Sequence, residues 1–176
     1  MFKNIHLHII LLLLLPLSSV SAQQVAKPIE QLTLVGSGKM SYLFWDIYIA
    51  KLYTQTGIYN NDHTMTALEF NYLRDIKAED LVNETLKQWR NLKLKQHEDE
   101  QQWLRQLITL WPDISEGDQL VFFINAQGHA EFYYNGNLTG SLDSTEFSYR
   151  FKQIWLSDKT SAPGVRRKLI RSSPGK

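Results

Sequence analysis

The sequence predicts a protein of the α+β class, with an antiparallel β-sheet covered by helices. Strand formers with an alternating pattern dominate residues 40–53 and 66–73, and two segments with helical spacing follow up to residue 111. Residues 119–142 then have the short apolar runs and turn residues of a β-meander. Because strands and helices occupy separate runs instead of alternating, α+β is favoured over a parallel α/β fold.

The first 22 residues have the order of a secretory signal peptide. Lys3 provides the positive charge at the start, Ile9–Leu15 is an apolar run, and small residues lead up to Ala22. The run is shorter than the roughly 20 apolar residues that a transmembrane helix needs. We therefore expect an exported protein, periplasmic in a bacterium, with no transmembrane segment and with one mature domain at residues 23–176.

Composition narrows the range of partners. The chain has 19 Lys and Arg and 18 Asp and Glu, so removal of Lys3 with the signal peptide leaves 18 of each sign. Such a neutral chain lacks the basic surface on which nucleic-acid affinity depends, so we expect no nucleic-acid partner. The sequence has no cysteine, so its stability has to come from an apolar core without disulfides.

The first expected strand, at residues 32–35, leads into Gly36-Ser37-Gly38, which we interpret as a tight turn. A phosphate-binding loop is the alternative for glycines followed by Lys39. That loop requires G-x-x-x-x-G-K-[ST] before a helix, whereas here the glycines are two residues apart and Met40 replaces the hydroxyl residue. The phosphate loop is therefore rejected.

A single long strand is expected at residues 40–53, and it is apolar on both faces. One face would pack on helices while the other lines a pocket. Asp46 lies in the middle of this strand, where a buried carboxylate would need a partner such as Arg74. A structural ion pair or an edge position is favoured for Asp46 over a catalytic role.

Three helices are expected after the strand at residues 66–73. Asp75 is a candidate N-cap of the first, which presents Leu81 and Trp89 on its apolar face, and the second ends before Pro112. Turns at residues 126–128 and 135–136 define the meander, and Asp143 and Glu146 form a possible capping box for the third helix. The basic segment after residue 162 is interpreted as a solvated terminus, with a membrane headgroup or an acidic partner as alternatives.

No metal site, cofactor or catalytic residue is expected. His63, His97 and His129 lie in separate segments, without the spacing or the cysteines of a zinc site. The chain also lacks the G-x-S-x-G motif of a serine nucleophile.

Three segments together resemble the bacterial chalcone isomerase-like family, which includes exported members. They are LVGSGKMSYLFWDIYIAKLY, FNYLRDIKAEDLVNETLKQW and FYYNGNLTGSLDSTEFSYRFKQIWLSDKTSAPGVRRKLI, and the resemblance extends from about residue 32 to residue 170. It implies an open-faced antiparallel sheet covered by helices, with a cleft between them for a flat or long apolar ligand.

The resemblance also implies where a catalytic set would lie. Plant enzymes of this fold use an arginine, a threonine, and a helical tyrosine and asparagine to stabilise charge during ring closure. Lys39 lies near the place of the arginine and Tyr48 takes the place of the threonine, while the helical pair falls near Lys77 and Glu84. Because most of this set is missing, the reaction of the family is not carried over.

Non-catalytic relatives of this fold bind fatty acids, and this implies the leading hypothesis, a binder of a small hydrophobic or aromatic acid. In this hypothesis Lys39 meets the carboxylate and a tyrosine hydroxyl donates to it, beside an apolar wall. Alternatives are an intramolecular lyase of altered residues, a periplasmic accessory protein that binds a protein partner, and aromatics that simply fill a core. The candidate ligand-binding residues are Lys39, Tyr42, Phe44, Trp45, Tyr48 and Phe70.

Overall fold

The computed structural model describes residues 28–60 and 65–171. The signal peptide expected at residues 1–22, His63 and the last residues of the basic tail lie outside this part of the chain.

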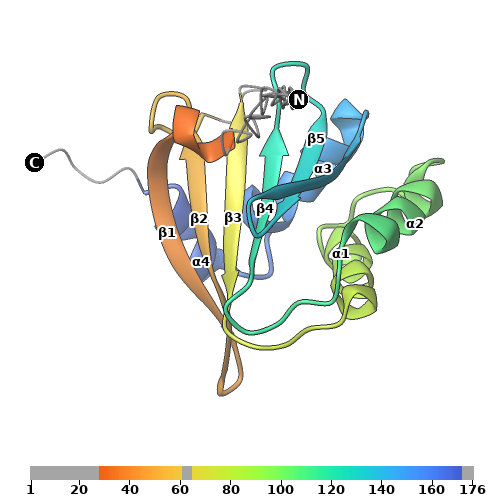
Figure 1. Ribbon diagram of the computed structural model, residues 1–176, viewed down its shortest axis with the longest axis horizontal. Helices are drawn as coiled ribbons and strands as arrows, with labels where there is room; N and C mark the ends of the chain where they lie inside the picture. The colour runs from red at the N-terminus through yellow and green to blue at the C-terminus, as the bar shows by residue number, and fades with distance from the viewer. Residues whose placement is uncertain (1–27, 61–64, 172–176) are drawn as a thin grey trace, which may run out of the picture.

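Within the described residues the chain forms a six-stranded antiparallel sheet in which the strands follow one another in sequence order (Figure 1). Each strand pairs with the next one along the chain, so the sheet is a continuous meander. The α+β prediction is confirmed. The strands are β1 (Thr33–Tyr42), β2 (Trp45–Thr54), β3 (Thr66–Tyr72), β4 (Gln119–Ile124), β5 (Ala130–Tyr134) and β6 (Asn137–Leu142).

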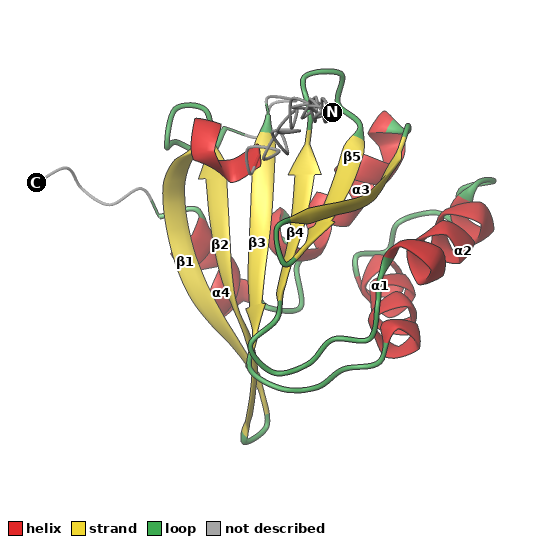
Figure 2. Cartoon of the chain, viewed as in Figure 1, coloured by secondary structure: helices red, strands yellow, loops and turns green. Residues whose placement is uncertain are grey.

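The helices enter between β3 and β4 and after β6. Figure 2 shows α3 and α4 behind the sheet and the pair α1 and α2 beside it. The short helix η1 packs Ile29 near Ala67 and Val121, on the face of the sheet that the longer helices leave open. The bounds are η1 (Pro28–Gln31), α1 (Ala78–Asn91), α2 (Glu100–Leu110), α3 (Thr145–Leu156) and α4 (Pro163–Leu169).

The core lies between the helix-covered face of the sheet and α3. The ring of Phe151 on α3 has its centroid 4.7 Å from that of Phe122 on β4 and 5.6 Å from that of Phe132 on β5. Phe147, one turn earlier, stacks on Phe151 at 5.5 Å. All four side chains are buried, and burying rings of this size is the main stabilisation available to a chain without disulfides.

The single long strand expected at residues 40–53 is wrong, because the chain reverses at Leu43 and Phe44. Tyr42 pairs with Trp45, so this segment is the closed end of the β1–β2 hairpin. Leu43 adopts a φ of 54°, a conformation that turns normally give to Gly or Asn. The sequence gives no such residue here, which is why its pattern is that of one uninterrupted strand.

The turn expected at residues 36–38 is also wrong, since these residues lie inside β1. A Cβ atom on Gly36 would come within 2.6 Å of the Leu169 carbonyl oxygen, and one on Gly38 within 3.2 Å of the Val165 carbonyl oxygen. The glycines therefore serve the close approach of α4 to the strand rather than a turn. The prediction that the basic segment after residue 162 is a solvated terminus is therefore also wrong in part. Val165 and Leu169 of this segment are buried, although Arg167 and Lys168 remain exposed.

The three expected helices form, but their caps differ from the expected ones. α1 begins after Lys77, and its first amide, that of Ala78, donates to Oδ1 of Asp113 from a distant segment at 3.0 Å. α3 is capped by Ser144, which lies one residue after the expected cap Asp143. The Ser144 hydroxyl accepts a hydrogen bond from the Phe147 amide.

Candidate functional site

A cavity of about 520 Å³ lies between the helix-covered face of the sheet, α1, α3 and the segment before α4. Strands β1 to β4 provide its floor through residues such as Met40, Phe70 and Leu120. Leu81 of α1 and Ile154 of α3 close it from the opposite side. A single sheet covered by helices on one face leaves this space where the helices diverge.

Aromatic side chains form one continuous wall of the cavity. Tyr48 meets Phe70 edge-on with ring centroids 5.2 Å apart, and Phe70 lies 4.6 Å from Trp155. Trp155 in turn meets Phe151 at 5.3 Å. Such a wall is rigid and apolar, the typical environment of a bound flat or long-chain molecule.

Two tyrosine hydroxyls and an indole N–H are polar groups of the interior: Tyr48 and Tyr72 line the cavity, as does Trp111, whose buried Nε1–H has no hydrogen-bond partner among the described residues. The Trp155 Nε1–H donates to the Tyr48 hydroxyl oxygen at 2.8 Å, so the Tyr48 proton can be donated elsewhere. Burial raises the pKa of Tyr48 to about 12, and burial also raises the pKa of Tyr72 well above its usual range. Both hydroxyls therefore stay protonated near neutral pH and act as donors, not as bases.

The charged groups of the cavity are confined to its mouth. Glu84 and Lys87 of α1 form an exposed ion pair at 3.1 Å. Gln88 donates to Glu84 at 2.6 Å and accepts from the Ser161 hydroxyl at 2.7 Å, which connects α1 to the segment before α4. Of the described residues that line the cavity, Lys87 is the cation.

The structure brings together three of the six candidate residues and separates the other three from them. Tyr42, Tyr48 and Phe70 line the cavity. Lys39, Phe44 and Trp45 do not: the last two lie at the exposed end of the β1–β2 hairpin, and Lys39 donates to Asp46 at 2.6 Å.

Strand alternation with Met40 turns Lys39 away from the cavity, and a β-bulge on β2 brings its partner Asp46 to the same face. Met40 pairs with Tyr48 and Ser41 pairs with Asp46, so Ile47 is an extra residue on β2. The bulge turns Asp46 away from the face of Tyr48 and towards the opposite face of the sheet, where Lys39 lies. An ion pair was expected for Asp46, but its partner is Lys39 instead of Arg74. Hydrogen bonds from Lys39 and Ser41 hold the pKa of the Asp46 carboxyl below its usual value.

The positions at which the resemblance to the plant enzymes implies a catalytic set lie partly in the cavity and partly outside it. Tyr48 lies in the cavity and Glu84 at its mouth, whereas Lys77 pairs with Asp113 at 2.7 Å, away from it. Phe151, Ile154 and Trp155 were missed as site residues. Their helical spacing indicated an inward face, but a spacing pattern does not distinguish a residue that lines a space from one that fills a core.

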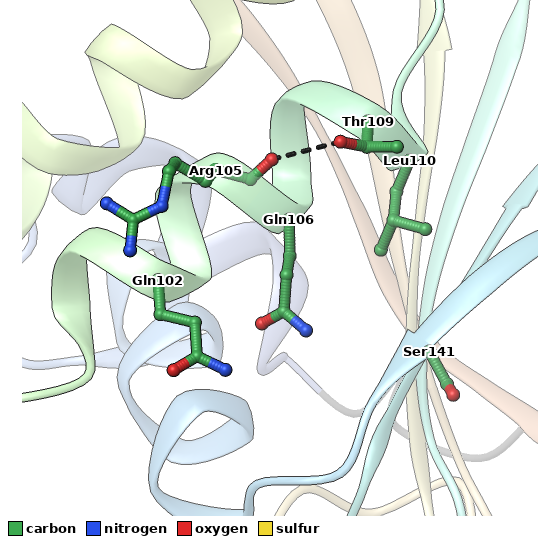
Figure 3. Close-up of a pocket in the computed structure, with 6 residues that line it drawn as sticks. All are labelled: Gln102, Arg105, Gln106, Thr109, Leu110 and Ser141. Carbon is green, nitrogen blue, oxygen red and sulfur yellow. Dashed lines mark hydrogen bonds between the residues drawn. The ribbon is translucent and has the colours of Figure 1, made fainter.

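A second hollow, of about 340 Å³, lies between α2 and β6 (Figure 3). Most of its lining residues are polar or charged, with Gln102, Arg105 and Gln106 from α2 and Ser141 from β6. The Thr109 hydroxyl is already used, since it donates to the Arg105 carbonyl oxygen at 3.1 Å. This hollow is open and offers little apolar surface, so it is the weaker candidate for a hydrophobic ligand.

Two absences hold for residues 28–60 and 65–171, the part of the chain that the structure describes. No group of three or more His, Cys, Asp or Glu residues in them is arranged to hold a metal ion. No helix in this part of the chain combines the length and the apolar character that crossing a membrane requires.

Comparison with known proteins places this geometry in a family. The family model described as chalcone isomerase-like matches residues 19–170. An uncharacterized protein of Haemophilus influenzae is 23% identical over 145 residues, which cover 82% of this chain and 71% of that protein. The crystal structure of a fatty-acid binding protein of Arabidopsis thaliana superposes with a TM-score of 0.65 at 12% identity, covering 80% of this chain and 87% of that one. The family model spans most of the chain, and the chain therefore belongs to the chalcone isomerase-like family.

Proposed function

We propose that this protein binds a small hydrophobic acid in the cavity between α1, α3 and the sheet, without converting it. The observation that carries the proposal is the combination of an aromatic interior, two neutral hydroxyl donors and a mouth that holds the charged groups. A volume of about 520 Å³ lies within the range of roughly 300–1,000 Å³ typical of small-molecule sites.

The distribution of charge favours one orientation of the ligand. A carboxylate buried without a cation would be strongly disfavoured, and the interior offers only neutral donors. We therefore expect the carboxylate at the mouth near Lys87 and the apolar chain against Phe70 and Trp155. Lys87 thus takes the role that the sequence suggested for Lys39, which pairs with Asp46 outside the cavity.

Binding without turnover is favoured by the chemistry that an isomerase would need. Ring closure requires a fixed cation beside the phenolate and donors at the developing oxyanion. The described side chains that line the interior are apolar or neutral, and the side chain of Lys87, the cation at the mouth, is largely exposed. The Arabidopsis protein of the same fold is described as a fatty-acid binding protein, which supports this ligand class.

A cavity-filling variant tests the site. Leu81 lines the cavity from α1, so Leu81→Trp should place an indole in the ligand's space and weaken binding of palmitate by roughly tenfold or more. Asn83 is exposed on the same helix, and Asn83→Trp is the matched control that should leave affinity unchanged. The measurement is a calorimetric titration of the purified protein.

Three results would overturn the proposal. They are wild-type protein that binds neither fatty nor aromatic acids, equal affinity in the two tryptophan variants, and cyclisation of a chalcone by the wild-type protein at enzymatic rates.

Export to the bacterial periplasm also stays a proposal, supported by the pattern of residues 1–22. N-terminal sequencing of the protein from a periplasmic fraction should give Gln23 as the first residue. An intact Met1 on protein recovered from the cytoplasm would contradict it.

A further inference from the structure

The closed end of the β1–β2 hairpin exposes four consecutive large side chains, Tyr42 to Trp45, which we call the hairpin tip. The exposed fractions are 65% for Tyr42, 77% for Leu43, 97% for Phe44 and 63% for Trp45. The hairpin extends beyond the rest of the fold at the bottom of Figure 1. Isolated exposed apolar residues are common, but four in a row on a protruding turn indicate an interaction site.

The backbone conformation of the turn indicates that its side chains were not selected to stabilise the turn. Leu43 has a φ of 54°, where Gly or Asn would be accommodated with less strain. A leucine therefore does not favour the turn, and Phe44 contacts little of the protein. The Leu43 and Phe44 side chains therefore stabilise neither the core nor the turn, and they project outward.

The charges around the tip favour an anionic surface. Asp46, the carboxylate that follows Trp45 in the chain, is neutralised by Lys39 at 2.6 Å, while Asp75, Asp80 and Asp113 line a hollow together with Arg74. The Arg74 guanidinium lies 5.3 Å from the centre of the Trp45 ring. On the other side, Arg167 and Lys168 of α4 line a shallow hollow together with Lys39 and Tyr42. Exposed aromatic and leucine side chains flanked by cations are the composition of elements that enter the lipid headgroup region.

The tip is also continuous with the candidate site. Tyr42 belongs to the tip and lines the cavity, and Met40 lies between the cavity and the hollow beside α4. A surface that covers the tip would therefore adjoin the β1 wall of the cavity.

We propose that the hairpin tip inserts into the interfacial region of a bilayer that contains anionic lipids, with Lys39, Arg74, Arg167 and Lys168 near the headgroups. This docking goes beyond the proposed ligand binding and does not depend on it. It would bring the cavity to the source of an apolar ligand.

The test is flotation of the purified protein with vesicles of phosphatidylcholine and phosphatidylglycerol. The variant Leu43→Asn/Phe44→Ser removes the two most exposed apolar side chains and gives the turn a residue suited to positive φ. Ile58→Ser is the matched control, because Ile58 is 55% exposed in the loop after β2, at the other end of that strand. All three proteins carry the same N-terminal segment, so a difference among them reports the tip.

We expect the wild type and Ile58→Ser to float with the vesicles, and the double variant to lose at least tenfold in partitioning. Brominated lipids should quench tryptophan fluorescence in the wild type and much less in Trp45→Phe.

Wild-type protein that does not float, or a double variant that floats equally well, would overturn the proposal. The proposal would also be overturned if the wild type did not bind vesicles but associated with itself, and the double variant lost this self-association. A second copy of the chain would then cover the tip. Phe44→Ser alone repeats the comparison if the double variant folds poorly, since the Phe44 side chain is almost fully exposed.

Discussion

Tyr48 links the sheet to α3 and at the same time offers a proton to the cavity. Its hydroxyl oxygen accepts from Trp155 Nε1 at 2.8 Å, and its ring packs edge-on against Phe70 and Tyr72. Because burial raises the pKa of Tyr48 to about 12, the residue donates across the whole physiological pH range. One side chain thus positions the aromatic wall and contributes a polar group to it.

Tyr48→Phe tests the contribution of the Tyr48 hydroxyl, because the variant keeps the ring and its packing but removes the acceptor of the Trp155 hydrogen bond. Loss of the acceptor leaves the Trp155 indole N–H without its partner, so we expect a decrease of about 1 kcal/mol in the free energy of unfolding, measured by denaturant titration. Tyr42→Phe is the control, because its ring is largely exposed and should change stability by less than about 0.5 kcal/mol. Equal effects in the two variants would contradict the role given to Tyr48.

Glu69 is a buried carboxylate on the open face of the sheet, where Lys51 at 2.7 Å, Tyr53 at 3.0 Å and Asn71 at 2.6 Å donate to it. Burial raises the pKa of Glu69, but these hydrogen bonds and the charge of Lys51 outweigh it, and the pKa ends below its ordinary value of 4.5. Since the folded protein holds the carboxylate more firmly than the unfolded chain does, Glu69 contributes stability above that pH.

We therefore expect stability to fall as the pH decreases below about 4.5, and Glu69→Gln to reduce this dependence. At neutral pH the variant should lose about 1–3 kcal/mol, because it exchanges charge-assisted hydrogen bonds for neutral ones. Unfolding curves measured between acid and neutral pH test the prediction. A variant with the same acid sensitivity as the wild type would show that other carboxylates dominate.

At the scale of elements, the contact between β1 and α4 depends on the absence of side chains. A Cβ on Gly36 would meet the backbone carbonyl oxygens of Lys168 and Leu169, which cannot move away without displacing the helix. Glycines inside a strand indicate either a turn or a close approach, and sequence alone does not decide between them. Neither could sequence locate the hairpin turn, since Leu43 and Phe44 are strand formers.

Gly36→Ala should lower the free energy of unfolding by about 1–3 kcal/mol, as expected when atoms are added to a well-packed contact. Gly164→Ala is the matched control on α4, because its Cβ would come no nearer than 3.9 Å to Arg167 Nη2. That change should be neutral or stabilising, by up to about 1 kcal/mol. Thermal or chemical unfolding of both variants distinguishes tight packing at Gly36 from a general sensitivity of the segment to substitution. Equal losses of unfolding free energy in the two variants would contradict the tight contact between β1 and α4.

At the scale of the whole molecule, local patterns predicted the class, the order of most elements and the helical faces. Tyr42, Tyr48 and Phe70 were assigned to the cavity side because strand alternation and the family resemblance both placed aromatics there. Lys39 was assigned to the cavity because the family resemblance implies a cation near this position, but alternation with Met40 turns it to the opposite face of the sheet. The bulge at Ile47, which turns Asp46 to that same face, has no signature in the sequence. The cavity itself arises from how α1 and α3 diverge over the sheet, which no single segment encodes.

The central claim is that an apolar acid occupies the space between α1, α3 and the sheet. The most direct measurement is photocrosslinking with a long-chain fatty acid that carries a diazirine in its tail, followed by peptide mapping. We expect label on cavity residues such as Leu81, Phe151 and Ile154, and its loss in Leu81→Trp but not in Asn83→Trp. Label confined to the hollow between α2 and β6 or to the hairpin tip, or no specific label, would contradict the claim.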